Sequence, residues 1–323
     1  MHTTTLHTVT GPLSYESVRG PVLAHEHLVL DLDLKGDGGA VLDARRHGPS
    51  VATELAALRD EFDLSLVVEL TCRGMGRDPG ALAALSRESG VAVVAATGWY
   101  YEPFHTQELA DTSVERLTET LVREIEDGFE GTDTHTGTDT GIRPGVLGEI
   151  GSHGDTPSEP EVRSLRAAAR AASATGLSVA THAQLGHGGL AQLELLTAEG
   201  LPPHRVSIGH QDLLDEPGVH KELAASGAYV AFDTVGKEGY QSDDTRLRLL
   251  LSLIEAGHAD RALLSCDISR HGYLSAEGGQ GYGHLFRSFL PRLRAAGADD
   301  DLVDLLTRRN PLRFLTGASV EEI

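Results

Sequence analysis

The sequence predicts an α/β fold, a (β/α)8 TIM barrel formed by a single domain over residues 1–323. The first observation is that eight short, apolar, β-rich runs alternate with longer segments of helical periodicity. The second is that 40% of the residues are hydrophobic, enough for one large core, and that no low-complexity linker divides the chain. Eight strands with intervening helices are typical of such a barrel. The alternative is an open doubly wound sheet, but the glycine-rich phosphate turn usual in that fold is missing.

The eight expected strands are short, and several are nearly continuous in apolar residues. Continuous apolar runs are expected of parallel strands that are covered on both faces. In chain order, the expected strands are residues 22–27, 64–71, 91–97, 145–150, 177–182, 206–210, 229–233 and 262–267.

Seven helical patterns separate or follow these strands. The alanine-rich run 165–174 is a strong helix former, and Gly176 is a stop signal behind it. In chain order, the expected helices are residues 81–89, 113–128, 160–175, 189–199, 217–226, 245–256 and 285–296.

Three polar segments are expected to be loops. Residues 234–244 and 269–283 follow the seventh and eighth strands, where barrels build the mouth of the active site. Residues 131–141 are rich in Gly, Thr and Asp and predict a surface loop, in which His135 is expected to be solvated and not a metal ligand.

The amino-acid composition limits the classes of binding partner that we expect for this protein. The formal net charge is −21, from 27 basic and 48 acidic residues, so the surface repels phosphate backbones and anionic lipids. We therefore expect no nucleic-acid and no membrane partner.

The two cysteines, Cys72 and Cys266, make no disulfide framework and suit a reducing compartment. No secretory signal is visible and no apolar run approaches the roughly 18–20 residues of a membrane span, so we expect a cytoplasmic protein.

Potential metal ligands stand at the ends of five of the expected strands. His25 and His27 close the first strand, and because side chains alternate across a strand, both face the same side. Burying an ionised carboxylate is energetically unfavourable unless a cation lies next to it. Glu149 ends an apolar run, so its position indicates a nearby cation. Each residue taken singly has a plainer interpretation, such as a hydrogen-bonded core histidine or a capping carboxylate. Their repetition at strand ends favours a metal centre, with the candidate ligands His25, His27, Glu149, His182, His210 and Asp267.

The segments that carry these residues resemble those of a known family. In order they are AHEHL (24–28), LGEIG (147–151), THA (181–183), IGHQDL (208–213), CDISR (266–270) and RNPLRFL (309–315). On this set, the sequence resembles the phosphotriesterase-like branch of the amidohydrolase superfamily over nearly its whole length. The resemblance implies two divalent ions, with zinc expected. It assigns the more buried ion to His25, His27 and Asp267 and the more exposed ion to His182 and His210, with a carboxylate and a hydroxide between them.

The bridging position departs from the founding phosphotriesterases, which use a carboxylated lysine there. This chain has Glu149 at the fourth strand, and its three lysines, Lys35, Lys221 and Lys237, lie elsewhere. Glutamate bridges occur in branches of the family that act on other substrates. Phosphotriester hydrolysis is therefore not expected as the native role.

The expected mechanism is attack by an activated water. Two ions about 3.5–4 Å apart acidify a bridging water and polarise a carbonyl. Asp267 is expected to take the proton of that water and pass it to the leaving oxygen. Tyr100 follows the third strand, and it either donates a hydrogen bond near the metals, as the resemblance to lactonases implies, or only lines the pocket.

An anion site is expected in the loops after the seventh and eighth strands, where barrels commonly bind phosphate. Lys237, Arg270 and Tyr273 supply two cations and a phenol there, and the match is to family members that open phosphorylated sugar lactones. The alternative is that these cations form salt bridges with Glu238 or Asp244.

The expected function is hydrolysis of a small-molecule lactone or carboxylic ester, with a phosphorylated sugar lactone as the most specific expectation. The alternatives are hydrolysis of an N-acyl amide at the same centre, promiscuous phosphotriesterase activity, and a barrel that binds a ligand without turnover. No G-x-S-x-G motif supports a serine nucleophile. A homodimer is compatible with the sequence, which does not determine the oligomeric state.

Overall fold

The computed structural model of the protein describes residues 5–129, 141–319 and 322–323. The expected loop at 131–141, with His135, lies outside these residues except for Gly141. Within the described ranges, no helix is both long and apolar enough to cross a membrane.

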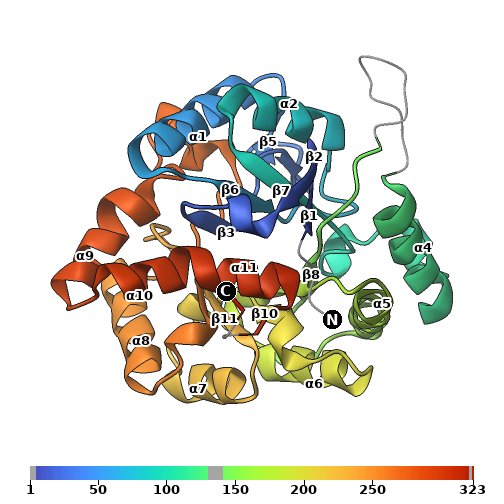
Figure 1. The fold of residues 1–323 in the computed structure, drawn as a ribbon. Coiled ribbons are helices and arrows are strands. Elements are labelled where there is room, and N and C mark those ends of the chain that lie inside the picture. The colour runs from blue at the N-terminus through green and yellow to red at the C-terminus, as the bar shows by residue number, and fades with distance from the viewer. Residues whose placement is uncertain (1–4, 130–140, 320–321) are drawn as a thin grey trace.

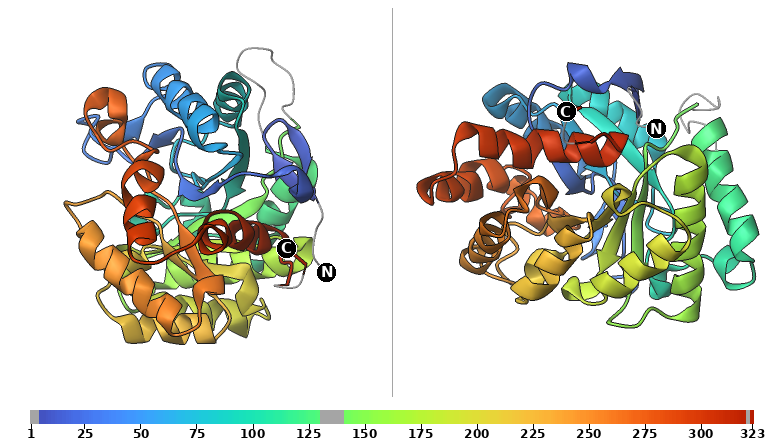
Figure 2. Two further views of the ribbon diagram at one scale, coloured as in Figure 1. Left: turned by 60° about the vertical axis from the view of Figure 1, so that its left-hand side comes forward. Right: turned by 60° about the horizontal axis from the view of Figure 1, so that its bottom comes forward.

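Eight parallel strands form one sheet in the order β12-β11-β10-β9-β8-β7-β6-β3, which confirms the predicted barrel. The two end strands approach each other, and there the His25 amide donates to Ser265 Oγ (3.1 Å) and the Asp267 amide donates to the His25 carbonyl (3.3 Å). Helices surround the strands (Figures 1 and 2). The strands are β3 (Val22–Glu26), β6 (Leu66–Glu69), β7 (Ala92–Thr97), β8 (Val146–Ser152), β9 (Val179–Ala183), β10 (Val206–Ile208), β11 (Tyr229–Phe232) and β12 (Ala262–Leu264).

Five strands end earlier than the sequence predicted: β3 and β11 by one residue, β6 and β10 by two, and β12 by three. β10 stops at Ile208 instead of residue 210, and β12 stops at Leu264 instead of residue 267. His210 and Asp267 have positive φ angles, 56° and 48°, which are incompatible with a continuing strand. Both side chains therefore follow their strands and lie just beyond the sheet.

All seven predicted helices are present, with shifted ends. The longest, α5, begins with a capping box formed by Ser158 and Glu161 and ends at Gly176, whose φ of 77° suits a helix C-cap. The seven are α2 (Pro79–Ser89), α4 (Val114–Asp127), α5 (Glu159–Thr175), α6 (Gly189–Ala198), α7 (Pro217–Ala225), α8 (Asp243–Glu255) and the continuous pair η9 (Leu285–Phe289) and α9 (Leu290–Ala295).

Several elements were not predicted. The most important is α1 (Gly48–Phe62), which lies between β3 and β6 in the chain and buries Val51, Leu55 and Leu58. Its opening Gly-Pro pair is typical of a turn, although proline is also favoured in the first turn of a helix. The others include β1 (Thr5–Thr8) paired with β2 (Gly11–Ser14), β4 (Leu30–Asp31) paired with β5 (Val41–Leu42), α3 (Gln107–Ala110), α10 (Asp300–Asp304), η10 (Leu305–Arg309) and α11 (Asn310–Thr316).

The core has an inner and an outer part. Alternate residues of β6 belong to different clusters, with Leu66 and Val68 facing other strands and Val67 facing the helices. Leu312 and Phe314 of α11 pack into the inner cluster. Figure 1 shows α11 crossing one end of the barrel near both termini, so this end is closed and the opposite end is left for the site.

Candidate metal centre

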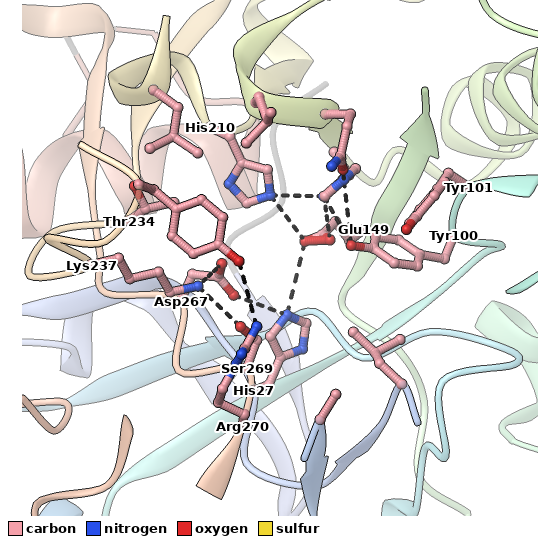
Figure 3. A pocket seen from close by; sticks show the side chains of 17 residues that line it. His27, Tyr100, Tyr101, Glu149, His210, Thr234, Lys237, Asp267, Ser269 and Arg270 are labelled. Atoms are coloured by element: carbon pink, nitrogen blue, oxygen red, sulfur yellow. Dashed lines mark hydrogen bonds and ion pairs between the residues drawn. The ribbon is translucent and has the colours of Figure 1, made fainter. Parts of the chain in front are cut away.

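The structure brings all six predicted ligands together at the ends of the strands. His27 Nε2 lies 3.3 Å from Asp267 Oδ1, and His210 Nε2 lies 2.8 Å from His182 Nδ1. Glu149 lies between His27 and His210, with its Oε2 3.9 Å from Nε2 of each (Figure 3). Every one of the six is less than 7% exposed, so their polar atoms are removed from bulk water.

These residues form two groups of a size that could hold one cation each. In each group the ligand atoms lie within 4.8 Å of one another, and the groups are His25, His27 and Asp267, and Glu149, His182 and His210. Glu149 faces both groups, because its Oε2 is 2.7 Å from His25 Nε2 and its Oε1 is 3.0 Å from His182 Nδ1. One carboxylate therefore offers one oxygen to each group.

The donor set fits a pair of divalent cations. His25 Nε2 and Glu149 Oε2 are buried and face each other at 2.7 Å, and neither atom has a well-oriented hydrogen-bond partner among the described residues. Burial alone would raise the pKa of Glu149, but His182 and His25 outweigh it and hold the pKa well below the ordinary value. A buried anion surrounded by imidazole nitrogens is the environment that cations such as Zn²⁺ require.

Each histidine is also held at its outer nitrogen. His25 Nδ1 and His210 Nδ1 lie 2.7 and 2.9 Å from the two oxygens of Asp233. His27 Nδ1 lies 2.8 Å from Thr71 Oγ1, and His182 Nε2 lies 2.7 Å from Gln184 Oε1. Such outer contacts orient the rings of metal ligands.

None of these outer partners was predicted. Asp233 ends an apolar run in the same way as Asp267 does, so the same signal could have found it. Thr71 is an ordinary strand residue in the sequence, and its importance depends on a contact with His27 and on donation of its hydroxyl to Glu69 Oε1 (2.5 Å).

The Glu26 carboxylate forms hydrogen bonds with the backbone on both sides of Asp267. It accepts hydrogen bonds from the amides of Cys266 and Ile268, both at 2.8 Å, and from Ser265 Oγ at 2.8 Å. Burial raises the pKa of Glu26 to about 7 despite these donors. The carboxylate lies on the opposite side of the strand from the two histidines beside it, because side chains alternate along a strand, and it stabilises the left-handed conformation of Asp267.

Tyr100 lies against the candidate centre and also lines the pocket. Its hydroxyl is 3.1 Å from His182 Nδ1, and its ring meets the His182 ring edge-on at 4.6 Å. Tyr101 stacks on His182 with a ring distance of 5.4 Å and an angle of 9°. The two tyrosines enclose His182 from two sides.

The three residues of the expected anion site are neighbours. The Tyr273 ring lies between two cations, with its centroid 5.1 Å from Lys237 Nζ and 4.9 Å from Arg270 Cζ. Lys237 and Arg270 line the pocket, whereas Tyr273, which was predicted as a third substrate contact, does not line it and contacts both cations through its ring. Arg270 has no carboxylate partner among the described residues, and its guanidinium is 3.5 Å from the Tyr240 hydroxyl.

Lys237 has a partner that the sequence did not suggest. Its ammonium contacts Asp267 Oδ2 and lies 3.0 Å from Ser269 Oγ. Burial alone would lower the pKa of Lys237, but the charge of Asp267 outweighs it and raises the pKa. The alternative partners are engaged elsewhere, because Glu238 accepts the Asp243 amide and Asp244 pairs with Arg292.

Buried anchors hold the two mouth loops. Arg246, fully buried in α8, donates to Asp212 (2.8 Å) and to the Lys237 carbonyl (3.1 Å), which fixes the loop that carries Lys237. On the other loop, the Tyr282 hydroxyl donates to the His27 carbonyl at 2.7 Å. Glu54 of α1 accepts the amide of Ser275 at 2.6 Å.

The pocket above the centre is small and mixed in character. It has a volume of about 190 Å³, and its lining includes Glu149, His182 and Asp267. Arg270 and the ion pair of Lys237 with Asp267 also line the pocket. Its size and lining suit a small molecule with a polar reacting group and an anionic substituent.

Comparison with known proteins gives one consistent result. The model of the phosphotriesterase family matches residues 4–315. The phosphotriesterase homology protein of Escherichia coli (strain K12) is 37% identical over 296 residues, which cover 91% of this chain and 97% of that protein. Its crystal structure, complexed with phosphate in the active site, superposes with a TM-score of 0.87 at 36% identity and covers 93% of this chain and 99% of that one.

Two further relatives have named activities. An N-acetyltaurine hydrolase from Danio rerio is 31% identical over 312 residues, covering 92% of this chain and 82% of that protein. The crystal structure of a lactonase from Listeria monocytogenes has a TM-score of 0.86 at 26% identity and covers 98% of this chain and 100% of that one.

Proposed function

The chain belongs to the phosphotriesterase family and is a metal-dependent hydrolase, and from this premise we propose that it opens a small anionic lactone, most specifically a phosphorylated sugar lactone. The observation that carries the proposal is the arrangement of Lys237 and Arg270 beside the Glu149 centre in one pocket. A hydrolytic centre selects the bond to be broken, and the two cations select an anionic substituent next to it.

We propose that two divalent ions, with zinc as the expected metal, bind at this centre. His25, His27 and Asp267 would hold one ion, and His182 and His210 would hold the other, with Glu149 shared between them. When bound, the ions would acidify the attacking water and polarise the scissile carbonyl. A chain that retains all six donors is better explained as an enzyme than as a barrel that only binds a ligand.

Asp267 is the proposed proton acceptor. Its Oδ1 faces His27 and the pocket, where it can take the proton of the attacking water and pass it to the leaving oxygen. Its Oδ2 is held by Lys237, which keeps the carboxylate in place and ionised. Tyr100 is proposed to donate a hydrogen bond to the substrate from the pocket wall.

A second candidate is hydrolysis of an N-acyl amide that bears an anionic group. The supporting observation is the 31% identity with the N-acetyltaurine hydrolase, a named activity in which the substrate carries a sulfonate. The same cations would bind a sulfonate as well as a phosphate, and the same centre would attack an amide carbonyl. A neutral phosphotriester would leave the Arg270 guanidinium without an anionic partner and is the weakest of the alternatives.

Chelation and a substrate panel test the proposal. The purified protein is expected to contain about two divalent ions per chain, measured by elemental analysis. Removing them should abolish hydrolysis of phosphorylated lactones, and adding zinc back should restore it, because without an ion the pKa of water stays near 15.7 instead of about 7. Full activity in metal-free protein would refute the mechanism, and a preference for N-acyl amides or phosphotriesters in the same panel would refute the lactone assignment alone.

Arg270→Ala is expected to raise KM for a phosphorylated lactone by about 10- to 100-fold, because a charge-assisted contact contributes about 1.5–3 kcal/mol. KM for the unphosphorylated lactone should hardly change. Arg248→Ala is a matched control, since Arg248 is an exposed arginine paired with Asp215 at 2.6 Å and does not line the pocket. Equal losses on both lactones would show that Arg270 only supports its loop.

A further inference from the structure

Asp233 is a buried carboxylate just beyond β11 and underneath the candidate centre. It is 1% exposed, and its two oxygens have separate tasks. Oδ2 accepts a hydrogen bond from His25 Nδ1 (2.7 Å), and Oδ1 accepts one from His210 Nδ1 (2.9 Å). Oδ1 also accepts the backbone amide of His210 (2.9 Å), which stabilises the left-handed conformation of that residue.

The two histidines that share Asp233 belong to different metal groups. His25 belongs to the group with His27 and Asp267, and His210 to the group with Glu149 and His182. Their rings stack with a centroid distance of 5.3 Å and an angle of 29°, so they lie side by side above the carboxylate. Asp233 is therefore in direct contact with both halves of the proposed centre.

The outer nitrogens of His27 and His182 each contact a residue that is not shared with the other metal group. His27 Nδ1 contacts Thr71, and His182 Nε2 contacts Gln184, and each of these contacts serves one group only. In the part of the chain that the structure describes, Asp233 is thus the one outer carboxylate shared by the two groups.

His25, His210 and Asp233 also lie close enough together to form a cation-sized group, but Asp233 contacts both rings at Nδ1. It does not line the substrate pocket, and it borders instead a separate internal cavity of about 10 Å³ beneath the centre. Both of its oxygens already face N–H donors. An ionised carboxylate can only accept hydrogen bonds, so both imidazoles carry their proton on Nδ1 and direct the Nε2 lone pair toward the centre.

We infer that Asp233 is a positioning residue that couples the two metal sites, because a single carboxylate sets the tautomer and orientation of one ligand in each. The two ions consequently load together, and a change at Asp233 affects both sites. This inference rests on the proposed binuclear centre.

The substitution Asp233→Asn keeps the shape of the side chain but allows it to accept a hydrogen bond from only one of the two histidines. Asparagine offers one oxygen acceptor and one NH₂ donor, so it satisfies Nδ1–H of only one histidine. The other histidine faces a donor and must move its proton to Nε2, which removes the lone pair that would bind the ion. The variant should lose affinity at one site by roughly 10- to 100-fold, and the binding of the two ions should become separate steps.

The test is zinc titration of chelator-treated protein, followed by calorimetry and elemental analysis. Wild type is expected to take up two ions in one cooperative step, and Asp233→Asn to bind them in two resolved steps or to retain one. Thr71→Val is the matched control, because among the ligand histidines it removes an acceptor from His27 alone, and it should weaken the His27 site by a similar factor while the other site keeps wild-type affinity. It also removes the hydroxyl donor to Glu69, so its stability is measured in parallel. Thermal melting of the metal-free proteins shows whether any loss of affinity merely follows loss of the fold.

A second measurement does not depend on the variant. In zinc-loaded wild type, NMR of ¹⁵N-labelled histidine should show a proton on Nδ1 of both His25 and His210. A proton on Nε2 of either residue, independent loading of the two ions in wild type, or wild-type cooperativity in Asp233→Asn would overturn the inference and leave the proposed hydrolase intact. Absence of metal binding in wild type would overturn the centre and the coupling together.

Discussion

Glu149→Gln is expected to lower kcat/KM by about two to four orders of magnitude and to reduce the bound metal below two ions per chain. The substitution keeps the size of the side chain and removes its charge. Glu149 directs one oxygen toward His25 (2.7 Å) and the other toward His182 (3.0 Å), so the neutral amide leaves two cations close together without their shared anion. Removing one partner from a buried charged pair costs about 3–5 kcal/mol, which corresponds to this range of rates.

Glu124→Gln is a suitable control for Glu149→Gln. Glu124 is also a buried carboxylate, and it pairs with Arg77 at 3.0 Å and does not line the pocket. Its substitution should lower Tm without loss of bound metal, as elemental analysis will show. Two ions and a native rate in Glu149→Gln would be incompatible with a bridging role for this residue.

Asp267→Asn is expected to reduce kcat by about 10²- to 10⁴-fold at full metal occupancy, the usual contribution of a positioned acid or base. KM should change much less, because the lost group moves a proton and does not hold the substrate. The structure adds a second consequence, since the variant leaves the buried ammonium of Lys237 without its carboxylate. We therefore also expect a loss of stability of about 3–5 kcal/mol.

The double variant Asp267→Asn/Lys237→Met separates these two effects. It removes the unpaired charge and should recover much of the lost Tm, while kcat should stay low. Metal content must be measured in the same samples, because Asp267 is also a proposed ligand. Near wild-type kcat in fully loaded Asp267→Asn would rule out the proton-acceptor role.

The barrel could be predicted because its signals are local. An apolar run such as that of β7 predicts a covered strand from its own residues, and the helix α5 carries its own capping box and its own stop at Gly176. The helix α1 was missed for the same reason, because a Gly-Pro opening is ambiguous until the helix packs on the barrel. The position of the site followed from topology, since the carboxyl ends of parallel strands meet at one end of a barrel.

The sequence by itself therefore determined the alternation of strands and helices and the six polar residues that reach one end of the barrel. Only the tertiary structure decided which atoms meet there. Asp233 and His25 are 208 positions apart, and Lys237 and Asp267 are 30 apart, and no local pattern pairs them. The physical reason is that hydrogen bonds and ion pairs depend on distances of about 3 Å between side chains, and closure of the barrel sets those distances between strands remote in the chain.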